Sequence, residues 1–168
     1  MATTNERLTE WLRDAHATEE QAKTMLKGTS GRIENYPAFK ERLAQQADIA
    51  GRHADVLQEC LDKRGESPSM VKEMTGKITA IGQSLSGIVV GDEVVKAALA
   101  TITFAQMQAA SYRILVAAAQ AADDPEVRSI CEGLLADETS FANWLDEHLP
   151  TLTTEYLSRE ETGATAKH

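Results

Sequence analysis

The sequence predicts an all-α protein built as a bundle of four long helices. Three observations support this fold class. Alanine is abundant while aromatic residues make up 5% of the chain, a balance that favours helices over strands. Apolar residues recur at spacings of three and four, the period of one helix face. Glycine, proline and capping residues also divide the chain into segments of helical length.

Each predicted helix has its own start and stop signals. The first covers about residues 5–27 and is expected to end at Gly28, because glycine is the usual residue after a helix. Pro37 opens the second helix, which ends before Gly65. The remaining helices are a short, glycine-interrupted one over residues 68–86, a third long one over 91–122 and a fourth over 125–148, which Pro150 is expected to end.

The length of 168 residues suits a single domain. We expect residues 1–150 to form one helical bundle. Residues 151–168 are predicted to be a short, partly disordered C-terminal extension, with a helical turn near Tyr156 and Leu157.

Charge and hydropathy argue against two classes of partner. The formal net charge is −9, which disfavours binding to nucleic acid or to anionic membranes. The uncharged run at residues 97–112 is too short to span a bilayer. The charged N-terminus lacks the apolar core of a signal peptide. We therefore expect a cytoplasmic protein, with Cys60 and Cys131 as buried, reduced thiols.

Four polar residues interrupt the apolar stripes near the midpoints of the long helices: Glu19, His53, Gln108 and Glu138. Helix midpoints in a bundle lie at similar depth, so these side chains are expected to converge in one interior layer. A buried carboxylate needs a metal, a shared proton or hydrogen-bond donors such as Gln108 and Tyr112. The alternative is that the glutamates lie at the edge of the core and reach water.

Several segments resemble the YciE/YciF-like stress-protein family of the ferritin-like superfamily. They are "WLRDAHATEEQA", "RIENYP", "GDEVVKAALA", "ASYRIL" and "DET…WLDEHLP", and the resemblance covers about residues 6–150. It implies a ferritin-like four-helix bundle with an extra short helix in the crossover between the second and third long helices. It also implies a homodimer, and a family pattern of carboxylates and histidines that bind two irons.

Carried over residue by residue, the resemblance implies a degenerate di-iron site. Glu19 and Glu138 match the glutamates of the first and fourth helices. Gln108 stands where the family has a metal-binding glutamate, and Gln46 where it has a histidine. Around Ile49 the chain reads "DIA" in place of an acidic run. An amide keeps the shape of a carboxylate but is a poor ligand for iron.

Three functions follow as hypotheses. The first is a non-catalytic structural or interaction protein of a stress response, a homodimer with an unknown protein partner, no cofactor and no enzyme activity. The second is a protein that binds iron or another single divalent metal through Glu19, His53 and Glu138. The third is a carrier with a small apolar ligand beside the alanine-rich residues 97–122.

Overall fold

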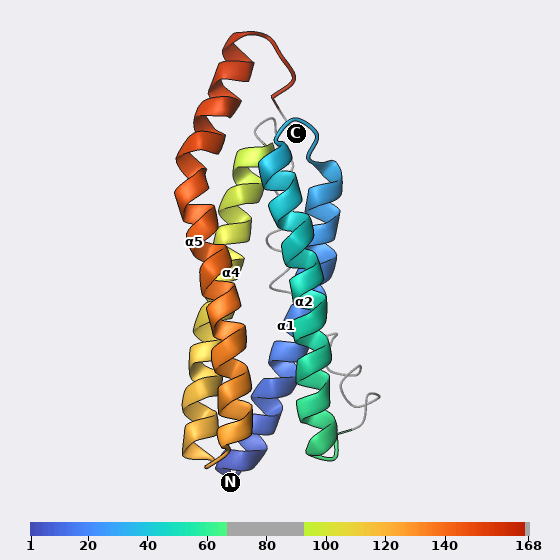
Figure 1. Cartoon of the computed structure of the whole chain (residues 1–168), viewed down its shortest axis with the longest axis vertical. Coiled ribbons are helices and arrows are strands. Elements are labelled where there is room, and N and C mark those ends of the chain that lie inside the picture. The colour runs from blue at the N-terminus through green and yellow to red at the C-terminus, as the bar shows by residue number, and fades with distance from the viewer. Residues whose placement is uncertain (67–92, 167–168) are drawn as a thin grey trace.

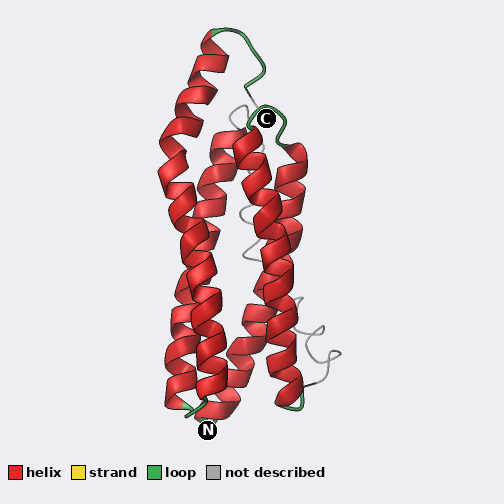
Figure 2. Ribbon diagram, in the orientation of Figure 1, coloured by secondary structure: helices red, strands yellow, loops and turns green. Residues whose placement is uncertain are grey.

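The computed structural model describes residues 1–66 and 93–166, and these form four α-helices with no strand among them (Figure 2). The helices are α1 (Thr4–Arg32), α2 (Pro37–Lys63), α4 (Glu93–Ala121) and α5 (Pro125–Glu161). The predicted all-α four-helix bundle is therefore confirmed. The predicted short helix at 68–86 lies outside the described residues.

The bundle is made of two antiparallel hairpins packed side by side (Figure 1). α1 packs mainly against α2, and α4 mainly against α5, while α1 and α4 join the two hairpins. A short loop joins the helices of each hairpin, as is usual for antiparallel neighbours in a bundle.

Local signals account for the helix starts. Thr3 forms a capping box with Glu6, each side chain bonding to the backbone of the other. Pro37 and Pro125 occupy the first turns of α2 and α5, as predicted, and the Asp124 side chain accepts a hydrogen bond from the Val127 amide. After α2, Gly65 has a φ of 80°, a conformation that glycine adopts without strain.

The predicted end of the first helix at Gly28 is wrong, because α1 continues to Arg32. Interior glycines cost about 1 kcal/mol each relative to alanine, so packing must offset them. The Ser30 hydroxyl donates to the Lys40 carbonyl at 3.0 Å. Ile33, at the C-cap, is 1% exposed, and burying such a side chain contributes about 1.5–3 kcal/mol.

The predicted end of the fourth helix before Pro150 is also wrong, because α5 runs through Pro150 to Glu161. The boundary expected between residues 1–150 and 151–168 thus falls inside one helix. An interior proline costs about 3 kcal/mol. Beyond it, Leu152 and Tyr156 are buried in the same apolar cluster as Phe39, and these contacts hold the continuing helix against the bundle.

The core consists of two apolar clusters. One is centred on aromatic residues such as Phe39, Phe104 and Phe141. The other is rich in leucine and includes Leu8 and Leu57. On each helix, one buried polar residue lies between the part that packs in one cluster and the part that packs in the other. In chain order these residues are Glu19, His53, Gln108 and Glu138. The polar layer therefore divides the core in two.

Among the described helices, none combines the length and the apolar character needed to cross a bilayer.

The continuation of α5 past Pro150 leads to a stability prediction. Leu152→Ala should lower the free energy of unfolding by about 2–5 kcal/mol, because it empties a buried site. Leu157, in the same stretch of helix, is 49% exposed, and Leu157→Ala should change stability by only about 0.5 kcal/mol. Urea unfolding of the two variants provides the measurement. Equal, small effects would mean that this part of α5 does not pack on the bundle.

Candidate functional site

The four polar residues predicted from the sequence are all buried. The exposed fractions of Glu19, His53, Gln108 and Glu138 are 1%, 3%, 4% and 1%. Each comes from a different helix, and Glu19, His53 and Glu138 each offer one ligand atom within 4.8 Å of the others. The predicted convergence is confirmed for these three residues. The alternative that the glutamates reach water at the edge of the core is wrong.

His53 lies between the two carboxylates. Its Nδ1 is 3.3 Å from Glu19 Oε1 and 3.5 Å from Glu138 Oε1. One ring nitrogen therefore serves two acids that come from α1 and α5. A proton on this nitrogen can be shared between both carboxylates, so the imidazole ties the two hairpins together electrostatically.

Two neutral donors complete the hydrogen bonding of the carboxylates. The Tyr112 hydroxyl donates to Glu19 Oε1, and Tyr112 was one of the two donors considered from the sequence. Gln46 Nε2 donates to Glu138 Oε1 at 3.0 Å. The amide of Gln46 is itself oriented, because its oxygen accepts from Arg42 Nη1 at 3.4 Å. The role of Gln46 as a donor was not predicted. The sequence feature that could have indicated this role is the position of Gln46 on the apolar stripe, one helical turn from Ala50 and two turns from His53.

The other ring nitrogen of His53 reaches an acid at the surface. His53 Nε2 is 3.1 Å from Asp137 Oδ2, and the Asp137 side chain is 58% exposed. Asp137 was not predicted as part of the site, because it lies off the apolar stripe that contains Glu138. The sequence feature that could have indicated its role is the pair of adjacent acids at residues 137 and 138, in the segment "DET". With Asp137, His53 has an acidic partner on both ring nitrogens.

These contacts make His53 a cation at neutral pH. Burial by itself lowers the pKa of His53, but the hydrogen bonds to Glu138 and Glu19 outweigh burial and raise it to about 10. Burial and the nearby Glu19 charge raise the pKa of Glu138. Burial, together with the Glu19 carboxylate, raises the pKa of Tyr112 well above its ordinary value, so the phenol stays protonated and continues to donate.

Three polar atoms of the layer have no hydrogen-bond partner among the described residues. They are Glu19 Oε2, Glu138 Oε2 and Gln108 Nε2. Two are acceptors and one is a donor, and water can supply partners of both kinds. A cation could instead satisfy the two oxygens, which leaves the amide of Gln108 for another acceptor.

The fold and the buried layer define a ferritin-like four-helix bundle with polar residues at its centre. A family model described as a domain of unknown function (DUF892) matches residues 3–158, and the chain belongs to that family. It is also similar to protein XCC3681 from Xanthomonas campestris pv. campestris, a crystal structure. The two share 33% sequence identity, with a TM-score of 0.79 over 95% of this chain and 99% of that one.

The raised pKa of His53 predicts a loss of stability at alkaline pH. A histidine has a pKa of about 6.5 when unfolded and here about 10 when folded. Its contribution to stability is therefore fully present below about pH 6.5 and is lost as pH rises through about 10. Urea unfolding between these pH values should show a steeper decline for the natural protein than for His53→Gln. Parallel declines would contradict the assignment of an imidazolium.

Proposed function

We propose that this chain is a non-catalytic, metal-independent ferritin-like bundle that serves a structural or interaction role. Its resemblance to YciE/YciF-like proteins supports a place in a stress response. The observation that carries the proposal is the position of His53: an imidazolium lies between two buried carboxylates, where a ferritin-like metal centre would carry its positive charge.

The donor set does not fit a di-iron centre. Such a centre draws on about six side chains, four carboxylates and two histidines. Among the described residues, the group within ligand distance holds two carboxylates and one histidine. Gln46 and Gln108, which stand at family ligand positions, are neutral amides and weak ligands for iron. Gln46 also donates from its amide nitrogen to Glu138 Oε1, whereas an ionised carboxylate at this position would have no hydrogen to donate.

Charge also opposes metal binding. A metal at this site would have to displace the proton of His53, whose pKa is about 10, so binding would be weakened strongly at neutral pH. The hydrogen bonds from Tyr112 and Gln46 further stabilise the carboxylates without a metal. The layer is therefore able to satisfy most of its polar groups with protein donors alone.

A second function is supported by a separate observation. Glu19 Oε2 and Glu138 Oε2 lack partners among the described residues, and Glu19, His53 and Glu138 each offer a ligand atom within 4.8 Å of the others, a group that a single divalent ion accepts. Asp137 would then hold the Nε2–H of His53, as outer carboxylates orient metal-binding histidines. The alternative is thus a protein that binds one ion of iron or another divalent metal.

Metal content distinguishes these two functions. The untagged protein, analysed by plasma mass spectrometry before and after anaerobic addition of Fe(II), should hold well below one metal ion per chain. The double variant Gln46→His, Gln108→Glu restores two family ligands and should increase iron uptake. Gln45→Glu is the matched control, since Gln45 is exposed on the same helix as Gln46, and it should leave uptake unchanged.

One ion per chain that is lost in Glu19→Ala and in Glu138→Ala would contradict the metal-independent function and support the single-metal alternative. About two irons per chain would contradict both functions.

The proposal includes a homodimer that assembles through the outer face of α4. Leu99 and Ile114 are 61% and 54% exposed, and the positions between them on this face are Thr103, Gln106 and Ala110, all uncharged and exposed. An uncharged helix face with exposed large apolar residues is characteristic of a contact between subunits. The cytoplasm is the proposed compartment, supported by the two buried free thiols of Cys60 and Cys131.

The dimer surface leads to a mutational prediction. Leu99→Glu combined with Ile114→Glu places two charges on the face and should shift the protein from dimer to monomer, as measured by light scattering coupled to gel filtration. Leu157→Glu is the control, since Leu157 is exposed to a similar degree on α5, and it should leave the mass unchanged. A dimer that persists in the α4 double variant, or one that Leu157→Glu disrupts, would place the interface elsewhere.

A further inference from the structure

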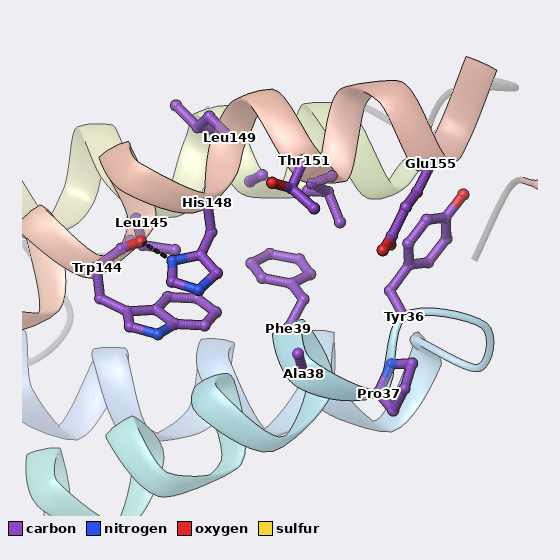
Figure 3. A pocket seen from close by; sticks show the side chains of 12 residues that line it. Tyr36, Pro37, Ala38, Phe39, Trp144, Leu145, His148, Leu149, Thr151 and Glu155 are labelled. Carbon is purple, nitrogen blue, oxygen red and sulfur yellow. Dashed lines mark hydrogen bonds between the residues drawn. The ribbon is translucent and has the colours of Figure 1, made fainter. Parts of the chain in front are cut away.

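An apolar cavity lies at one end of the bundle, away from the polar layer. It has a volume of about 110 Å³ and opens between the start of α2 and the stretch of α5 around Pro150 (Figure 3). Aromatic rings of Tyr36, Phe39 and Trp144 line it, with Leu145, Leu149 and Leu152. None of Glu19, His53, Gln108 and Glu138 takes part in its lining.

The size of the cavity suits one small ring. A dry protein cavity of about 150 Å³ lined by apolar side chains binds benzene. The present cavity is somewhat smaller and is open on one side, so it can hold a single aromatic ring with part of the molecule at the mouth. Aromatic linings favour such rings through stacked and edge-on contacts.

His148 lines this cavity and brings a hydrogen-bonding ring to it. Its ring stacks on that of Trp144, with centroids 3.9 Å apart and planes 17° from parallel. His148 Nδ1 is 2.7 Å from the Trp144 carbonyl oxygen (Figure 3). Because a carbonyl only accepts, Nδ1 carries the hydrogen, and in the neutral ring Nε2 is then an acceptor.

The charged group at the cavity also favours a donor on the ligand, and the Thr151 hydroxyl, which lines the cavity too, can accept as well as donate. The carboxylate of Glu155 lies at the end of the pocket nearest Tyr36 (Figure 3) and accepts hydrogen bonds only. The Tyr36 hydroxyl is already used, since it donates to the Ala166 carbonyl at 2.6 Å. The guanidinium of Arg159 lies 5.6 Å from the Tyr36 ring centroid. Its charge offsets that of Glu155, so a neutral donor suits the site better than a cation.

We propose that this cavity binds a small single-ring aromatic molecule that bears a neutral hydrogen-bond donor, with phenol as the simplest representative. The ring lies against Phe39 and the stacked pair of Trp144 and His148. The hydroxyl donates to His148 Nε2. This binding does not depend on the function proposed above, because the cavity and the buried polar layer share no residue.

Phenol and toluene form a matched pair of probes, because they have the same number of non-hydrogen atoms and differ by a hydroxyl against a methyl group. The Trp11→Phe protein retains Trp144 as its single tryptophan, so the indole N–H resonance of Trp144 reports directly on the cavity. Titration with phenol should shift this resonance saturably, with a dissociation constant of roughly a millimolar. Toluene should bind roughly three- to tenfold more weakly, the effect of one hydrogen bond.

Three variants test the geometry. In His148→Phe the ring remains but the acceptor is lost, and the preference for phenol over toluene should disappear while toluene still binds. Ala38 lines the cavity and is exposed, so Ala38→Leu should fill the mouth and abolish both shifts. Ala44→Leu, at an exposed position on the same helix, is the matched control and should leave both shifts unchanged.

Several results would overturn the proposal. They are the lack of a saturable shift with phenol, a shift that survives Ala38→Leu, and equal binding of phenol and toluene to the protein with natural His148. A Trp144 resonance that moves with protein concentration and ignores phenol would also overturn it, because a second copy of the chain would then occupy the cavity.

Discussion

The structure depends on one interaction at its centre, the contact of the His53 imidazolium with the carboxylates of Glu19 and Glu138. Glu19 and Glu138 are each 1% exposed, and their carboxylates would destabilise the fold strongly if they had no partner. A cation between them removes most of that cost. Because the three residues belong to α1, α2 and α5, the contact also sets the relative axial position of both hairpins.

The rest of the bundle is arranged around this layer. Apolar clusters fill the space on either side, so a shift of one helix by a turn would move a charged or polar residue into an apolar cluster. Tyr112 and Gln46 hold the carboxylates from α4 and α2, and Asp137 holds the outer nitrogen of His53. Among the described residues, both carboxylates therefore have hydrogen-bond donors from neighbouring helices.

Periodicity alone was sufficient to predict the four helices and the depth of the buried layer. Polar residues at the midpoints of apolar stripes have few other places to lie in a bundle. Helix ends were harder to predict. Gly28 and Pro150 are strong local stop signals, yet Ile33, Leu152 and Tyr156 gain more from burial than the breakers cost. Asp137 and the donor role of Gln46 could not be derived, because they depend on distances between helices.

The most direct test of the central claim is the protonation state of His53, read from the nitrogen chemical shifts of its imidazole ring by NMR as pH is raised. The account predicts that both ring nitrogens carry a proton at neutral pH and that the ring titrates near pH 10. A neutral ring at pH 7 would contradict it. The carboxylates would then need another source of positive charge, and a metal ion would be the first candidate.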